Sequence, residues 1–145
     1  MDAHKKVKGR KRHLVVDTCG NLLTLVVHSA GLQDFHAARQ VFTQLAQATW
    51  PRLETSFADA VYQNDPDLAE WVQEQFGWKL EIVQRDPNTK GFTPLPKRWV
   101  VERTFAWLGR NRRLSKDYEL HPKTTETWIY CAMTSLMSRR LARLL

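Results

Sequence analysis

Two short apolar runs near the start of the chain constrain its fold most. Residues 13–18 and 22–28 are rich in Val and Leu, and Thr18-Cys19-Gly20-Asn21 separates them. Apolar side chains occupy both parities of each run, so either run would need cover on both faces if it formed a strand. We therefore expect a β-hairpin whose strands are buried on both faces.

The rest of the chain alternates between helical and extended patterns. Strands are expected at 53–58 and 80–83. Helices are expected at 34–48 with Asp34 as N-cap, at 66–76 with Asp65 as N-cap and Gly77 as the stop, at 98–114, and from 125 to the end. Residues 85–97 hold three Pro, one Gly, Asp and Asn and are expected to form a loop or mobile linker. This order predicts an α/β chain with a single domain over residues 1–145.

The segment 98–113 places one carboxylate on the polar side of a helix. Its apolar residues fall on one arc at a helical period, and Glu102 falls opposite them, near the line of Arg98 and Arg113. The residues of the apolar arc are Val100, Val101, Phe105, Trp107, Leu108 and Leu114. A carboxylate fixed among arginines suits a divalent metal ion beside a phosphate backbone. A solvated ion pair is the alternative interpretation.

The charge of the chain favours a polyanionic partner. Its net charge is +7 and its pI is about 9.7, and the basic residues gather in one N-terminal run and around Glu102. A solvated face or a frayed terminus is the alternative for each cluster. We expect DNA contacts from ten residues: Lys5, Lys6, Lys8, Arg10, Lys11, Arg12, Arg98, Arg103, Arg110 and Arg113.

Several other classes of function find no support in the sequence. Cys19 and Cys131 have no metal spacing and indicate free thiols in a reducing compartment. The five histidines make no zinc pattern, and no serine has the glycine elbow of a hydrolase. The N-terminus lacks the apolar core of a signal peptide, and no apolar run reaches membrane-spanning length. We expect a cytoplasmic protein without a membrane partner.

Four blocks of the chain resemble transposases of the IS5 insertion-sequence family, which belongs to the DDE superfamily. The most specific is the stretch Arg-Trp-Val-Val-Glu-Arg-Thr-Phe-Ala-Trp-Leu-Gly-Arg that contains Glu102. The others, in the family's order, are residues 2–18 with their Lys-Gly-Arg-Lys core, Phe57-Ala-Asp59, and Gly77 to Val83. Together the four blocks extend over nearly the whole chain.

The resemblance implies a fold, an activity and a site. It implies an RNase H-like mixed sheet flanked by helices, in a bacterial protein that acts on DNA at the nucleoid. It makes Asp59 and Glu102 the second and third catalytic carboxylates and the ligands of Mg²⁺ or Mn²⁺, which catalyse phosphodiester cleavage and strand transfer. The family's first catalytic Asp lies on the first, central strand, upstream of the Lys-Gly-Arg-Lys block. We expect this chain to lack both that Asp and that strand.

The expected gap in the sheet leaves alternatives open. The hairpin and the 53–58 strand pair directly, another polypeptide donates a strand, or the domain is poorly stable. An upstream transposase segment or a second copy of the chain is the expected partner. At Asp59 the family's two following glycines are replaced by Ala60 and Val61, although Tyr62 follows as in the family. A turn-capping role for Asp59, and a non-catalytic DNA-binding or oligomerising remnant of a transposase, are the competing hypotheses.

Overall fold

The computed structural model describes residues 9–84 and 97–144 and confirms the α/β class. The 85–96 segment and Lys5, Lys6 and Lys8 lie outside these residues. In chain order the elements are β1 (Arg10–Val16), β2 (Leu22–Ser29), α1 (Asp34–Leu45), β3 (Thr55–Asp59), the 3-10 helix η1 (Ala60–Asn64), α2 (Leu68–Phe76), β4 (Lys79–Val83), α3 (Arg98–Gly109), the 3-10 helix η2 (Arg112–Leu114) and α4 (Pro122–Leu141).

Strand pairing differs from the single mixed sheet that was expected. β1 and β2 form an antiparallel hairpin, in which Arg10 lies opposite Ser29. β3 and β4 form a separate parallel pair, in which Thr55 lies opposite Lys79. Within residues 9–84 and 97–144, therefore, there are two two-stranded sheets, and β1 does not pair with β3. The alternative in which the hairpin and β3 close on each other is wrong for this structure.

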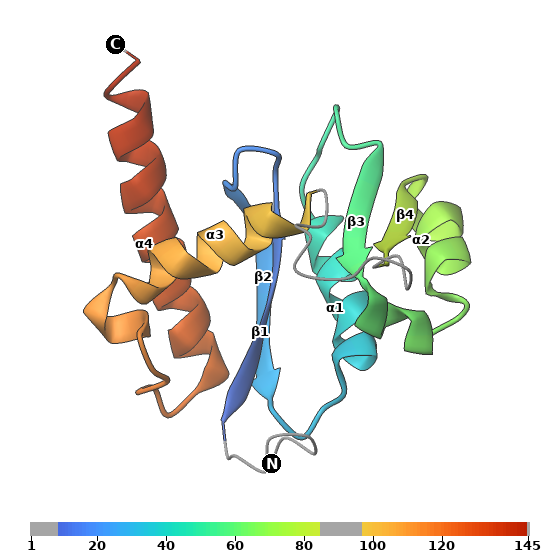
Figure 1. The fold of residues 1–145 in the computed structure, drawn as a ribbon, viewed down its shortest axis with the longest axis horizontal. Coiled ribbons are helices and arrows are strands. Elements are labelled where there is room, and N and C mark those ends of the chain that lie inside the picture. The colour runs from blue at the N-terminus through green and yellow to red at the C-terminus, as the bar shows by residue number, and fades with distance from the viewer. Residues whose placement is uncertain (1–8, 85–96, 145) are drawn as a thin grey trace, which may run out of the picture.

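The hairpin is buried on both faces, as predicted, because a different hydrophobic core packs on each. Leu14 and Val16 pack into a core that includes Leu25 of β2, Leu108 of α3 and Ile129 of α4. Val15 and Leu23 point the other way, since side chains alternate along a strand. They pack into a second core built mainly from α1, α2 and β4, including Phe42, Leu45, Leu68, Val72 and Leu80. Figure 1 shows α3 crossing one side of the hairpin, while α1 lies between the hairpin and β3.

α3 is fixed to the hairpin turn by a buried threonine. Thr104 is fully buried, and its Oγ1 lies 3.1 Å from the carbonyl oxygen of Gly20 and 3.0 Å from that of Val100. The Arg103 guanidinium donates to the carbonyl oxygen of Cys19 at 3.0 Å. Gly20 has a φ of +79°, which an L side chain rarely adopts. The close approach of α3 therefore depends on glycine at this turn.

Two predicted helix caps are wrong, and salt bridges explain both. α1 has Gln33 as its N-cap, and Asp34 instead lies 2.9 Å from Lys11 Nζ. α2 begins at Leu68 after Asp67, because both carboxylate oxygens of Asp65 accept from Arg39 at 2.9 Å. The stop at Gly77 is confirmed, with a left-handed φ of +73°. Sequence rules for caps failed where a distant basic side chain competed for the carboxylate.

The two C-terminal helices also have ends that differ from the predicted ones. The helix predicted to reach Leu114 ends at Gly109, and a short 3-10 helix follows after Asn111, whose side chain accepts from the Arg113 backbone N–H. α4 begins at Pro122, earlier than predicted, because proline suits the first turn of a helix.

Substituting Gly20 tests whether the α3 contact carries stability. A Cβ at Gly20 would lie 2.9 Å from both Thr104 Oγ1 and Trp107 Cζ3, whereas a Cβ at Gly77 meets nothing within 4 Å. Gly77→Ala should cost about 1 kcal/mol for the left-handed backbone alone. Gly20→Ala should lose that and about 1–3 kcal/mol more, because α3 must shift. Urea unfolding of both variants measures the difference, and equal losses would contradict the contact.

Candidate active-site groove

A large groove separates the hairpin from β3. It has a volume of about 1470 Å³, and its walls include Leu14, Val15 and Val16 of β1 and residues 55–59 of β3. α1 lines it with Ala38, Val41 and Phe42, and α3 lines it with Trp99, Val100, Val101, Glu102 and Phe105. In Figure 1 the N-terminal end of α3 lies between the blue hairpin and β3. The groove contains both acidic residues that the sequence nominated.

Asp59 lines the groove from the end of β3, one residue beyond the strand predicted at 53–58. It is the last residue of the strand and the N-cap of η1, and its Oδ1 accepts from the Ala60 backbone N–H at 2.7 Å. The turn-capping role considered for this residue is therefore present. The cap uses one lone pair of one carboxylate oxygen, and a carboxylate can accept several hydrogen bonds at once.

Glu102 enters the groove from α3, and the helix geometry explains its direction. Among the described side chains of α3, Val100, Thr104 and Leu108 are buried, and Thr104 and Leu108 pack against the hairpin. Val101 and Phe105 lie further round the helix with Glu102 and line the groove. The prediction that Phe105 belongs to the buried arc is wrong, because 37% of its surface is exposed. Thr104 is fully buried although it is polar and was not part of the predicted apolar arc.

α3 is also held at its first turn, next to the groove. Lys97 precedes the helix with a left-handed φ of +66°, and its Nζ lies 3.6 Å from the centroid of the Phe57 ring. This cation–π contact joins the start of α3 to β3. It therefore links the two elements that carry Glu102 and Asp59.

Two other acids line the groove but serve local structure. Asp17 Oδ1 accepts from the backbone N–H groups of Cys19 and Asn21 at 2.8 Å and so stabilises the hairpin turn. Asp34 lies against Lys11, as described above. No group of three or more His, Cys, Asp or Glu that could hold a metal ion occurs among residues 9–84 and 97–144. Asp59 and Glu102 thus share the groove without forming such a group with a third His, Cys, Asp or Glu among these residues.

The basic run 10–12 serves the fold in a way its charge did not reveal. Arg10 donates to the carbonyl oxygens of Glu119 and Leu120 and forms a salt bridge of 3.1 Å with Asp117. Arg12 donates to the carbonyl oxygen of Leu114 at 3.0 Å. β1 begins at Arg10, three residues earlier than predicted, and both arginines share the strand parity of Leu14 and Val16. Their side chains stabilise the connection before α4.

The predicted DNA contacts on and after α3 divide into two kinds. Arg103 is sandwiched between Trp99 and Trp107, with ring distances of 4.4 and 4.7 Å, and Arg113 lies 2.7 Å from Glu119. Arg110 is exposed at the end of α3. The side chain of Arg98 lies outside the described part of the chain. All ten basic residues stay predictions as DNA contacts.

A histidine pair at the groove was not predicted. Nδ1 of His13 lies 2.8 Å from the Tyr62 hydroxyl, and its Nε2 lies 2.6 Å from Nε2 of His28. The two imidazoles are stacked at 4.6 Å. Burial, and then the charge of His28, lower the pKa of His13 to about 4, while burial raises that of Tyr62. His13 lies opposite Val26 and His28 opposite Lys11, so the two histidines are diagonal neighbours on the hairpin, a relation that depends on the strand register.

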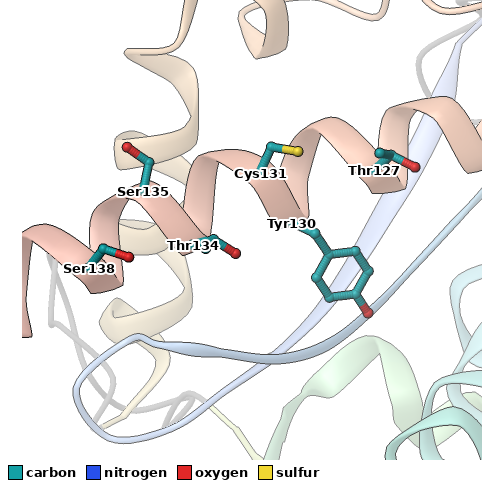
Figure 2. Close-up of a pocket in the computed structure, with 6 residues that line it drawn as sticks. All are labelled: Thr127, Tyr130, Cys131, Thr134, Ser135 and Ser138. Carbon is teal, nitrogen blue, oxygen red and sulfur yellow. The ribbon is translucent and has the colours of Figure 1, made fainter.

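A second hollow lies along α4 and is lined by that helix alone. Figure 2 shows its six residues, Thr127, Tyr130, Cys131, Thr134, Ser135 and Ser138, along the helix. They carry hydroxyls and one exposed thiol, and neither candidate carboxylate is among them. The groove between β1 and β3 is therefore the candidate site.

The low pKa of His13 predicts loss of stability in acid. Between about pH 6.5 and pH 4 the unfolded chain binds a proton at His13 and the folded chain does not. The free energy of unfolding should therefore fall over this range as pH decreases, by up to about 3 kcal/mol from this group. Urea unfolding at several pH values measures the slope. His13→Gln should flatten it and His121→Gln should retain it; equal slopes for all three proteins would contradict the burial.

Three comparisons with known proteins were informative at the level of the family only. No curated protein and no solved structure matches the chain. None of the helices in the described residues combines the length and apolar character that crossing a membrane requires. Residues 1–137 match the family described as Transposase DDE domain. Because this match extends over almost the whole chain, the chain belongs to the Transposase DDE domain family.

Proposed function

We propose that this chain is part of the catalytic domain of an IS5-type DNA transposase, with Asp59 and Glu102 as two of its metal-holding carboxylates. The observation that carries the proposal is that these two acids, from elements far apart in the sequence, line one groove in a chain of the DDE family. Cleavage and transfer of DNA strands in a bacterial cytoplasm is the corresponding activity, with DNA as substrate.

The roles of the two acids follow from their positions. Asp59 stands at a strand end and Glu102 on a helix fixed at both its start and its middle, so neither carboxylate needs to be ordered when a ligand arrives. When bound, a pair of Mg²⁺ or Mn²⁺ ions activates the attacking hydroxyl and stabilises the leaving oxygen. A third carboxylate, from outside the described residues, completes this site in the proposal.

The fold part of the proposal is an RNase H-like sheet. The antiparallel hairpin β1–β2 and the parallel pair β3–β4 lie on two sides of the groove, with helices α1 and α3 lining it. One further strand between β1 and β3 would join the pairs into a five-stranded mixed sheet.

A non-catalytic DNA-binding remnant is the second candidate. It is favoured by the finding that the described residues contain no cluster of three metal ligands. The two candidates differ in what a divalent ion does to DNA binding. In a transposase site Asp59 and Glu102 would hold the ion, which would add positive charge for DNA phosphates, whereas a remnant that binds DNA through its basic residues would gain nothing from the ion.

We expect Mn²⁺ to tighten binding of the chain to a labelled DNA duplex about tenfold, at constant ionic strength. Asp59→Asn and Glu102→Gln should each abolish this gain, because the neutral amide is a poor ligand for a hard cation. Asn still accepts a hydrogen bond at the cap of η1, so the fold is kept. Glu74→Gln, on the exposed side of α2, is the matched control. A gain that survives both groove substitutions would remove the site assignment.

We expect DNA binding without metal to be weak and steeply salt-dependent. The logarithm of affinity should fall with that of salt concentration by about 0.9 per phosphate contacted. Arg110→Ala should weaken binding to all sequences alike and reduce this slope by about 1. Lys79→Ala, which removes an exposed cation from β4, is the control and should change little.

Arg10 and Arg12 are unsuitable for this test, because their replacement removes hydrogen bonds to the chain before α4. Fluorescence anisotropy at two salt concentrations gives both affinity and slope. Equal effects of Arg110→Ala and Lys79→Ala would show that α3 does not face the DNA.

A further inference from the structure

The two long walls of the groove are strand edges. Among the described residues, β1 pairs with β2 on one side, and its Leu14, Val15 and Val16 line the groove. β3 pairs with β4 on one side, and all its residues from Thr55 to Asp59 line the groove. In Figure 1 the arrow of β3 points in the same direction as that of β2 and so runs opposite to β1. A strand placed between them would be antiparallel to one wall and parallel to the other.

β3 and the Leu14–Val16 part of β1 lack the features that usually prevent strand addition, whereas Lys11 and Arg12 supply charge nearer the start of β1. Proteins protect exposed edges with lysine, proline or inward-pointing charges. β3 reads Thr-Ser-Phe-Ala before Asp59, and β1 ends with Leu-Val-Val at residues 14–16. Ser56 Oγ, in the middle of β3, is buried and has no hydrogen-bond partner. These edges resemble the interior of a sheet more than its border.

The groove also has apolar side chains on both of its helical sides, where they would contact the two faces of an inserted strand. α1 contributes Ala38, Val41 and Phe42, and α3 contributes Val101 and Phe105. α1 belongs to the core on one face of the hairpin and α3 to the core on the other. Alternate side chains of a central strand would therefore meet α1 and α3 in turn. Strands covered in this way are apolar at nearly every position.

Large apolar side chains are left exposed at this place. Phe57, Val61, Trp99 and Phe105 each have between 37% and 48% of their surface exposed, and all four line the groove. A gathering of such residues marks a binding surface. The charged lining residues balance, with Lys11, Arg12, Arg52 and Lys97 against Asp17, Asp34, Asp59 and Glu102. Without a bound cation, this balance of side-chain charges favours an uncharged occupant over a polyanion within the groove.

We propose that the groove is a strand-acceptor site, which binds an extended apolar segment of another polypeptide by pairing its backbone with β1 and β3. The segment is rich in Val, Ile and Leu on both faces and joins the two sheets into one. A strand satisfies both edges at once, which a helix or a small molecule cannot do. The volume of about 1470 Å³ also exceeds that of ordinary small-molecule pockets. The inference does not depend on metal binding or DNA cleavage.

The probe for this site is a fluorescein-labelled peptide of about eight residues, with Val, Ile and Leu in the centre and lysines at both ends. Its matched control carries N-methyl groups on alternate central residues, which removes the N–H donors along one edge and keeps the apolar side chains. We expect saturable binding by anisotropy, weakened at least about tenfold by N-methylation. Hydrogen exchange of residues 55–58 should slow when the unmodified peptide is bound.

Two variants on α3 locate the peptide. Val101→Lys places a charge in the groove and should weaken binding at least about tenfold. Ala106→Lys, exposed on the same helix and not among the groove residues, should change affinity less than about twofold. Circular dichroism verifies that both variants are folded.

Three outcomes would overturn the proposal. The first is absence of peptide binding by the folded chain. The second is equal binding of the N-methylated peptide, or equal binding by Val101→Lys, because apolar contact without strand pairing would then explain the result. The third is a stable dimer that excludes the peptide in sedimentation, because the groove would then belong to a second copy of the chain.

Discussion

The contact between the hairpin turn and α3 determines where every other part of the site lies. Gly20 takes a backbone conformation that leaves no room for a Cβ, and this allows Thr104 and Trp107 of α3 to approach within van der Waals distance. Arg103 adds a hydrogen bond to the Cys19 carbonyl and lies between two tryptophan rings. Because one helix face is fixed on the hairpin, the next face, with Val101, Glu102 and Phe105, must line the groove.

The second constraint is that α1 serves both sheets. It packs against the hairpin and against η1 and α2, so the hairpin and the β3–β4 pair share a helix although they do not share hydrogen bonds. This arrangement leaves a groove that is lined by the edges of β1 and β3 and by the carboxylates of Asp59 and Glu102. The proposed metal site and the proposed strand-acceptor site therefore occupy one space, and a segment bound there would lie beside Asp59 and Glu102. A partner strand would change the surroundings of both acids.

Charge in this protein has structural uses that its net value conceals. Arg10, Arg12 and Arg113 bind carbonyl oxygens or carboxylates within the chain, and Arg103 is held by aromatic rings. Such contacts use the same guanidinium donors that a phosphate would take. The net charge alone could not show which arginines bind groups within the chain and which, such as Arg110 at the end of α3, are exposed.

The sequence by itself determined which segments become helices and strands, and it nominated the two acids of the groove. Apolar periodicity sufficed for this, because helices and strands repeat with different periods and each repeat is local. The family likeness identified Asp59 and Glu102, which neither spacing nor charge would have selected with certainty over a capping or surface role. Only the tertiary structure decided the pairing of strands, the groove, the salt bridges of Asp34 and Asp65 in place of the predicted caps, and the contacts of His13 with His28 and Tyr62. Each of these depends on contacts between residues distant in the chain, and such contacts leave no periodic trace in the sequence.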